Sequence, residues 1–272
     1  MIIVDDGSTD HTGEIADVYA TIFPDIVKVV HKQNGGHGSG VNAGLKLAGG
    51  TYFKVVDSDD WLDEEAYQKV LEELKHFGPA QYLIMHALIF WTDLLRRTGV
   101  QLPEHTFYVD NLFAYQPLPN VESVYYMDVN LYHYFLGRED QSVNEKVLMN
   151  RIDQQIKVTE LVADCVDLKE VKDKTPKLAA YMYRNVSIMM AISSIHLLLI
   201  GTEEAYEKRE KLWKRIKNED KGMYYRLRFT TISGFTYLPG KLGKKVTLGG
   251  YRAGRSLQRG KTKPVCPCFV RI

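Results

Sequence analysis

The stretch FKVVDSDDW, residues 53–61, joins an apolar, β-type run to three carboxylates within four residues. Clustered like charges repel one another, and each carboxylate has to stay hydrated or find a cation. A divalent metal resolves this conflict, because hard oxygen ligands at this spacing suit Mg²⁺ or Mn²⁺, and such an ion can hold a diphosphate. The structural alternative is a strand-to-helix turn in which Asp59 or Asp60 caps a helix that starts near Asp63.

Two earlier segments also place polar chemistry directly after a short apolar strand. Residues 2–10, IIVDDGSTD, pass from a strand to acids, a glycine turn and helix-capping residues. The strand at residues 27–31 is followed by the Gly-rich residues 33–44, whose backbone N–H groups can approach an anion, although a plain flexible turn would look the same. Because the carboxyl ends of neighbouring parallel strands share one crevice, the three strand ends predict a single ligand site.

Three motifs together resemble a known family: VDDGSTD at residues 4–10, NGG and NAG within residues 34–44, and DSDDW at residues 57–61. Their order and spacing resemble a family 2 glycosyltransferase of the GT-A fold, strongly over residues 1–75 and usably to about residue 145. The resemblance implies an α/β fold: a GT-A, Rossmann-like, mostly parallel sheet with flanking helices, followed by a helical C-terminal extension. It also implies an inverting transferase that uses a nucleotide-diphosphate sugar, often a UDP-sugar.

The resemblance also implies roles for individual residues. Asp6 would contact the base, Asp57 would lie by the ribose and the metal, and Asp59 would ligate the metal, so that Asp57 and Asp59 form the Mg²⁺ or Mn²⁺ site. The nucleotide-binding residues implied or considered are Asp6, Gly36, His37, Gly38, Asn42, Asp57 and Arg138. Arg138 could offset charge on the departing diphosphate, or could pair with a neighbouring acid on the surface.

Asp110 is the expected catalytic base. It lies in YVDNLF, residues 108–113, between apolar residues that should be buried. This segment resembles the family's Glu-Asp pair, with Val109 replacing the usual Glu, and the role of the Asp carries over to Asp110. A single carboxylate there would remove the proton of the acceptor hydroxyl as its oxygen attacks the anomeric carbon. The alternative for Asp110 is a helix N-cap.

Composition indicates one large globular domain, or a domain with an appendage: 272 residues, 45% hydrophobic and 25% charged. Three cysteines form neither a disulfide framework nor a zinc site, which favours a cytoplasmic location. Met1 leads straight into a strand, so no signal peptide is expected. We expect residues 1–145 to form the GT-A domain, residues 146–220 a helical extension, and residues 221–272 a basic tail.

The basic tail contains twelve lysines and arginines and no acid, although the whole chain carries a formal charge of only +1. Aromatic residues are mixed with these cations, which predicts an anionic partner. The inner face of the cell membrane is the expected partner, with peripheral attachment. A nucleic acid is an alternative anionic partner, but we do not expect one. A third possibility is that the tail is disordered and solvated and has no partner. The apolar run at residues 188–200 is too short to span a bilayer and predicts a buried helix, or one that lies against the membrane.

The pattern along residues 1–91 alternates strands and helices. We expect helices over residues 10–23, 38–48 and 63–77, and strands over residues 26–31, 51–57 and 82–91, as in a parallel sheet. The first helix has one apolar face, formed by Ile15, Val18, Tyr19 and Ile22. The aromatic residues of 105–137 are expected to be mostly core, while some could form the floor of an acceptor-sugar site.

The sequence departs from the family pattern in several places. The family has a further strand and helix before the equivalent of Ile2, the interval from Asp59 to Asp110 is short, and Val41 replaces a common Arg. An inactive or degraded transferase that acts as a scaffold is therefore an alternative function. A sugar nucleotidyltransferase is a second one. A dinucleotide-dependent oxidoreductase would require Gly-x-Gly-x-x-Gly after the first strand, where the chain has DDGS.

Overall fold

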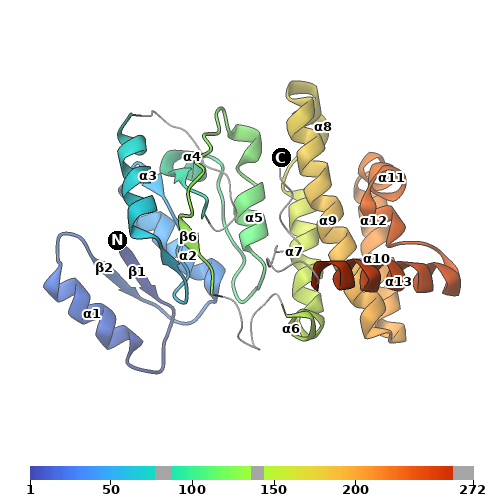
Figure 1. Ribbon diagram of the computed structural model, residues 1–272, viewed down its shortest axis with the longest axis horizontal. Coiled ribbons are helices and arrows are strands. Elements are labelled where there is room, and N and C mark those ends of the chain that lie inside the picture. Colours follow the sequence, from blue (N-terminus) through green and yellow to red (C-terminus); the bar gives the residue numbers. More distant parts are fainter. Residues whose placement is uncertain (77–86, 136–143, 260–272) are drawn as a thin grey trace. The chain divides into compact units, whose positions relative to one another are not determined.

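The computed structural model describes residues 1–76, 87–135 and 144–259 (Figure 1). It divides into two compact units, Met1–Gln141 and Ser142–Ile272, and each is described by itself. Several sequence-based predictions lie outside the described residues: Arg138, the first half of the strand expected at 82–91, and the cysteines at 266 and 268.

The N-terminal unit begins with a parallel strand pair. Strand β1 (Ile2–Asp5) pairs with β2 (Lys28–His31) in a register that runs from Ile2 opposite Lys28 to Asp5 opposite His31. Helix α1 (Thr12–Ile22) connects the two strands and packs on both, and α2 (His37–Leu47) packs against β1. The predicted β-α-β-α order is confirmed here, and the two strand ends that carry the polar motifs lie side by side.

The remaining strands of this unit pair antiparallel. Strand β3 (Tyr52–Phe53) pairs with β5 (Phe90–Trp91), and β4 (Trp61–Leu62) pairs with β6 (Tyr132–His133). Parallel pairing among the described residues is therefore confined to β1 and β2, which form the small parallel sheet of the expected α/β fold. The three strand pairs are separate two-stranded sheets among the described residues.

Short helices complete the core of this unit. Helix α3 (Glu64–His76) buries Ala66 and Val70 against Ile89 and Leu131. The other helices are α4 (Thr92–Arg97), α5 (Asp110–Tyr115) and the 3₁₀ turn η2 (Leu118–Asn120). The ring of Phe113 on α5 meets the rings of Phe53 and Phe90 edge-on, with centroids 6.3 and 5.3 Å apart.

Two apolar features of the N-terminal unit are more exposed than the sequence indicated. Of the nine aromatic residues expected to be mostly core between 105 and 137, the structure buries Phe113 and Tyr115. The predicted apolar face of α1 exists, but Ile15, Val18, Tyr19 and Ile22 are each half or more exposed. The spacing of apolar residues identifies an apolar face of a helix, but it does not show whether another element packs against that face.

The C-terminal unit is entirely helical where it is described. Its helices are α6 (Glu145–Asn150), α7 (Ile152–Asp164), α8 (Leu168–Lys174), α9 (Pro176–Ile200), α10 (Glu203–Glu219), α11 (Lys221–Thr230), α12 (Ile232–Phe235) and α13 (Gly240–Arg259). Helices α7, α8, α10 and α12 all pack on α9. At the start of this unit, Arg151 separates α6 from α7.

Helix α9 forms the centre of the C-terminal unit. By length and composition it is long and apolar enough to cross a membrane, yet 61% of its most apolar window is buried inside the protein. Met182, Val186 and Leu197 are fully buried. Its polar side chains are paired internally, since Ser194 Oγ accepts a hydrogen bond from Trp213 Nε1 at 3.1 Å and His196 Nδ1 lies 2.8 Å from the carbonyl of Ile192. The burial pattern is that of a core helix, as predicted for residues 188–200.

The basic tail is folded over residues 221–259. It forms α11, α12 and α13, so the alternative of a disordered solvated tail was wrong for this part. Helix α13 is held near its middle: Thr247 Oγ1 donates to the carbonyl of Phe235 at 3.0 Å, and Tyr251 donates to Glu145 at 2.6 Å. Arg255 also pairs with Glu145.

Candidate nucleotide-sugar site

The ends of β1 and β2 are joined by a carboxylate–imidazole contact. Asp5 and His31 are opposite each other in register, and His31 Nδ1 lies 2.8 Å from Asp5 Oδ2, while its Nε2 lies 3.0 Å from Asp17 on α1. Hydrogen bonds from Ser8 and His31 lower the pKa of Asp5 to about 2, and the two carboxylates raise the pKa of His31. This contact fastens α1 to the strand ends beside the site.

Asp6 holds the Gly-rich loop. Its carboxylate accepts hydrogen bonds from Lys32 Nζ at 2.6 Å, from the Gly35 N–H at 3.0 Å and from the Gly36 N–H at 2.6 Å. Partial burial alone would raise the pKa of Asp6, but these donors hold it below its usual value. The family resemblance predicted that Asp6 contacts the base of the nucleotide. The structure shows Asp6 engaged with the loop, and Lys32 is a partner that the sequence analysis missed.

The two glycines implicated in nucleotide binding allow close approaches of the backbone. Gly36 precedes α2 with φ +80°, a conformation that favours glycine. At Gly38, a Cβ atom would lie 2.7 Å from the carbonyl oxygen of Pro103, so any side chain there would displace the neighbouring segment. Both positions therefore bring α2 and its N-terminus against residues 102–105.

Asn42 fixes the same segment. Its amide Nδ2 donates to the Leu102 carbonyl at 2.8 Å, and its Oδ1 accepts from the Leu102 N–H at 2.9 Å. The Asn42 side chain thus bridges two parts of the chain sixty residues apart. After this segment, His105 and Tyr108 adopt positive φ values of 47° and 66°. Non-glycine residues in this region are strained, and such strain collects in binding loops that the surrounding structure holds in place.

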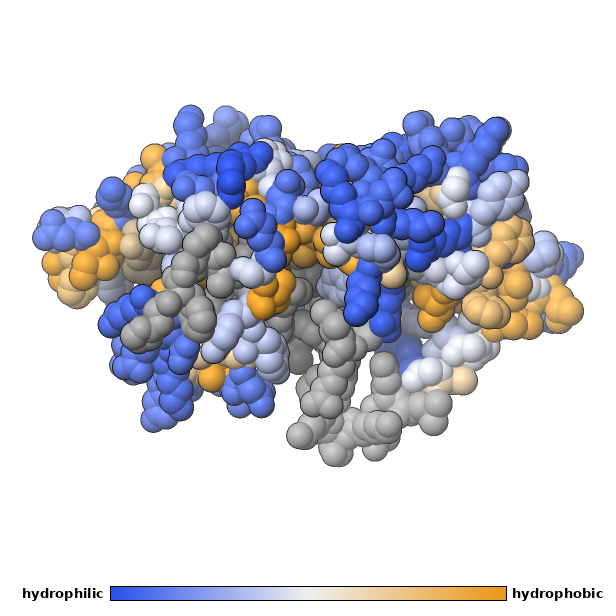
Figure 2. All heavy atoms as spheres, turned by 90° about the horizontal axis from the view of Figure 1, so that it is seen from above, coloured by the Kyte–Doolittle hydropathy of each residue, from blue (hydrophilic) through white to orange (hydrophobic). Residues whose placement is uncertain are grey.

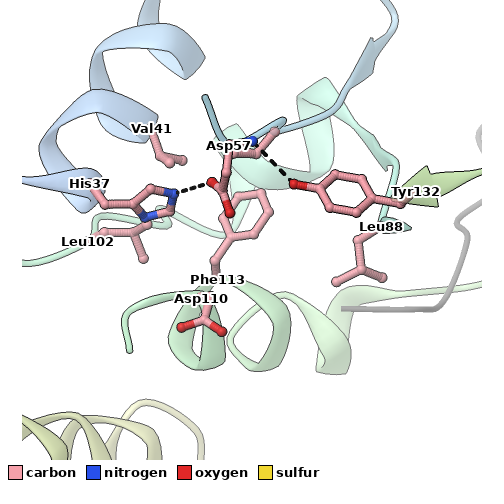
Figure 3. Close-up of a pocket in the computed structure, with 9 residues that line it drawn as sticks. His37, Val41, Asp57, Leu88, Leu102, Asp110, Phe113 and Tyr132 are labelled. Atoms are coloured by element: carbon pink, nitrogen blue, oxygen red, sulfur yellow. Dashed lines mark hydrogen bonds and ion pairs between the residues drawn. The ribbon is translucent and has the colours of Figure 1, made fainter. Parts of the chain in front are cut away.

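A small pocket brings three of the predicted site residues together (Figure 3). His37 comes from the first turn of α2, Asp57 follows β3, and Asp110 begins α5. The other lining residues are Val41, Val55, Leu88, Leu102, Phe113 and Tyr132. His37 Nε2 lies 2.9 Å from Asp57 Oδ1. This contact, with the charges of Asp57 and Asp110, raises the pKa of His37, and partial desolvation opposes the shift.

The structure also decides between the alternatives for the acidic residues. Val109 occupies the N-cap position of α5 without a side-chain capping bond, so Asp110 is a pocket residue and the N-cap alternative was wrong. Asp63 caps α3 through a 2.8 Å hydrogen bond from the Ala66 N–H, so neither Asp59 nor Asp60 takes that role. Asp60 instead accepts hydrogen bonds from the Tyr132 hydroxyl at 2.7 Å and from the Phe135 N–H at 3.0 Å.

Asp57 and Asp59 lie on one turn, which is closed by a 3.1 Å hydrogen bond from the Asp60 N–H to the Asp57 carbonyl. Asp59 is exposed and Asp57 is partly buried. Within the described ranges, no three His, Cys, Asp or Glu side chains gather in a way that could hold a metal ion. Mg²⁺ needs fewer protein ligands when phosphates and water complete its shell, and two carboxylates are a suitable donor set for that arrangement. The residues therefore fit a metal that binds together with a diphosphate.

Tyr132, which lines the pocket, and Lys54 beside it were not among the individually predicted site residues. Tyr132 accepts a 3.2 Å hydrogen bond from the Asp57 N–H and joins this turn to β6. Lys54 Nζ lies 4.6 Å from the centre of the Tyr132 ring. Burial lowers the pKa of Lys54 to about 8, although the charges of Asp57 and Asp60 oppose the shift. A lysine inside the apolar run of residues 53–56 was the available sequence signal.

Comparisons with known proteins show what this chain is similar to. The sequence profile described as "Glycosyl transferase family 2" matches residues 1–125. This match covers a little under half of the 272 residues. The chain is 44% identical over 73 residues to the uncharacterized glycosyltransferase EpsJ of Bacillus subtilis, a match that covers 27% of this chain and 21% of EpsJ.

A longer match extends beyond the three motifs. The uncharacterized glycosyltransferase MG025 homolog of Mycoplasma pneumoniae is 31% identical over 150 residues, which cover 49% of this chain and 50% of that protein. The matched segments thus span between about a fifth and a half of these two relatives. Among solved structures, residues 1–349 of TarS from S. aureus, in complex with UDP-GlcNAc, align with a TM-score of 0.60 and 16% identity over 96% of this chain and 82% of that one. This likeness supports the α/β, GT-A-like fold followed by a helical part.

Proposed function

We propose that this chain transfers a sugar from a nucleotide-diphosphate sugar to a hydroxyl group of a glycan or a lipid-linked acceptor, with inversion at the anomeric carbon. The main support is the meeting of His37, Asp57 and Asp110 in one pocket beside the Gly-rich loop, inside a segment that matches glycosyl transferase family 2. In this proposal residues 1–145 are the transferase domain, residues 146–220 a helical extension, and residues 221–272 the part that meets the membrane.

The proposed roles follow from where the side chains lie. Asp110 takes the proton of the acceptor hydroxyl while that oxygen bonds to the anomeric carbon, and the bond from this carbon to the diphosphate breaks. Asp57 and Asp59 hold Mg²⁺ or Mn²⁺, which when bound neutralises charge on the diphosphate. The nucleotide lies along the loop that Asp6 and Asn42 hold in place. Arg138 remains a predicted diphosphate contact.

The acceptor and the place of action are part of the same proposal. We place the enzyme in the cytoplasm, attached peripherally to the inner face of the cell membrane, where it would meet a glycan or lipid-linked acceptor. The proposal includes no nucleic-acid partner. The cations of residues 221–272 support such a location. The TarS complex makes UDP the first nucleotide to test, as the common part of UDP-sugars.

Calorimetry with UDP on the full chain, with and without Mn²⁺, tests the proposal. Wild-type protein should bind UDP more tightly with Mn²⁺, and Asp59→Ala should remove that gain. Asp110→Asn should keep the binding and lose sugar turnover by about 100-fold or more, since general-base catalysis supplies about that much. Asp25→Asn, an exposed acid outside the pocket, is the matched control and should change neither quantity. Full turnover by Asp110→Asn would rule out Asp110 as the base.

A non-catalytic nucleotide-sugar binding protein is the second candidate. It is favoured by the short parallel pairing of β1 and β2 and by the exposed apolar face of α1, which leave the N-terminal unit with a small sheet. Under this alternative, wild-type chain would bind UDP with Mn²⁺ and would neither transfer nor hydrolyse any UDP-sugar. Measurable hydrolysis that Asp110→Asn abolishes would exclude it.

A further inference from the structure

The C-terminal unit carries a group of exposed apolar side chains on α11, α12 and α13. This group, the tail patch, consists of Tyr225, Phe229, Ile232, Phe235, Leu242 and Val246, each more than half exposed. Phe235 and Leu242 are 73% and 76% exposed, which is unusual for side chains of this size. Figure 2 shows hydrophobic atoms gathered at that end of the C-terminal unit, with hydrophilic atoms next to them.

Contacts among the three helices make the tail patch one surface. The rings of Tyr225 and Phe229, one turn apart on α11, stack with centroids 6.1 Å apart. Helix α12 packs on α11, and the hydrogen bond from Thr247 to the Phe235 carbonyl joins α13 to α12. Leu242 and Val246 are also one turn apart, so they share one face of α13.

The charge beside the tail patch is of one sign. Lys241, Lys245 and Arg252 are exposed on α13, on the stripe that adjoins Leu242 and Val246, and the described residues offer none of these three cations an ion pair. Residues 221–272 contain no acid at all. Helix α13 therefore has three faces: one that packs on the protein, one that is apolar and exposed, and one that is cationic.

We infer that the tail patch docks on the anionic headgroup surface of a lipid bilayer. An amphipathic helix of this kind lies in the interface, with its apolar side chains at the acyl boundary and its cations among the lipid phosphates. A nucleic acid would use the cations but would leave Leu242, Val246 and Ile232 in water. This inference rests on the proposed function and deepens its membrane attachment, while the tail patch and the pocket belong to different units and are tested by different measurements.

Co-sedimentation of the full chain with phosphatidylcholine vesicles, with and without phosphatidylglycerol, tests this surface. Binding should require phosphatidylglycerol and weaken as salt is added. The triple variant Lys241→Gln, Lys245→Gln, Arg252→Gln should bind roughly 100-fold more weakly, because each cation near an anionic surface contributes about a fivefold gain in binding. The variant Phe235→Ser with Leu242→Ser should also lose most binding.

The matched control is Ile15→Ser with Ile22→Ser on α1, where the apolar face is similarly exposed but the helix has no basic residue. These changes should leave vesicle binding unaltered. A second readout is the fluorescence of Phe235→Trp, which should shift to shorter wavelength on anionic vesicles and be quenched by brominated lipid. Equal binding by wild type and the two tail-patch variants, or no binding to anionic vesicles at low salt, would overturn the inference. UDP affinity that stays constant in all variants would separate this result from failure of the transfer site.

Discussion

The polar loops of the N-terminal unit and the long helices of the C-terminal unit hold their side chains in place by different means. In the first, loops from distant parts of the chain are joined by hydrogen bonds at a few residues, above all Asp6 and Asn42. In the second, α9 and α10 bury large side chains such as Leu197 and Trp213. The difference teaches that the site depends on individual polar contacts, whereas the helical unit depends on packing.

The largest expected effect is in the packed unit. Trp213→Ala removes a fully buried ring that stacks on Tyr237 with centroids 4.5 Å apart and donates to Ser194. We expect a loss of about 3–5 kcal/mol in the free energy of unfolding, measured with denaturant and far-ultraviolet circular dichroism. UDP affinity should change little in conditions where the protein stays folded.

The control for this substitution is Trp61→Ala, because Trp61 is half exposed. It should cost about 1 kcal/mol or less. If the two tryptophan variants were equally unstable, the contrast between a packed unit and a unit held by polar contacts would not hold.

A smaller effect is expected at the main polar contact of the N-terminal unit. Asp6→Asn removes the charge that Lys32 pairs with and gives Gly35 and Gly36 a weaker acceptor. The expected cost is about 1–3 kcal/mol, together with weaker UDP binding in calorimetry. Asn42→Asp is the second variant to measure. It keeps the side-chain shape at the contact with Leu102 but removes the hydrogen-bond donor to the Leu102 carbonyl. Unchanged UDP affinity in both variants would show that the loop is not held by these groups.

The smallest expected effect concerns pH and the contact between His37 and Asp57. The pKa of His37 is raised in the folded protein, so the contact contributes stability fully below the ordinary pKa of 6.5, and this contribution is lost as pH rises through the raised value. Deprotonation of His37 also removes the positive charge that lies beside the Asp57 carboxylate. The Mn²⁺-dependent part of UDP affinity should therefore rise a few-fold with pH across this range, as measured by calorimetry.

His37→Gln tests whether His37 causes this pH dependence of UDP affinity, because glutamine keeps a hydrogen bond but does not titrate in this range. In this variant the pH dependence should flatten, and NMR of the wild-type imidazole should report the raised pKa directly. A pH profile that is the same in both proteins would assign the titration to another group.

Local patterns predicted much of this fold. Period-two and helical patterns located β1, α1, β2, α2 and α3 to within a few residues, because such patterns depend only on neighbours in the sequence. The polar residues after each strand also indicated the edge of the sheet where His37 and Asp57 meet. The apolar run at residues 188–200, which predicted a buried helix, likewise lies in the core helix α9.

Non-local contacts could not be predicted in the same way. The antiparallel pairing of β4 with β6 joins residues about seventy positions apart, and so does the hydrogen bond between Asp60 and Tyr132. The use of Asn42 to hold Leu102 depends on a loop of irregular conformation, for which the sequence offers no periodic signal. The exposure of the apolar face of α1 was also hidden, because it depends on which elements pack there.

The contacts of Asp6 have a kinetic consequence. Since this carboxylate already fixes Gly35 and Gly36 in the free protein, an arriving ligand does not have to bear the entropy of ordering that segment. Association should then proceed in one step at a rate set by encounter and charge, without a slow rearrangement phase in stopped-flow traces.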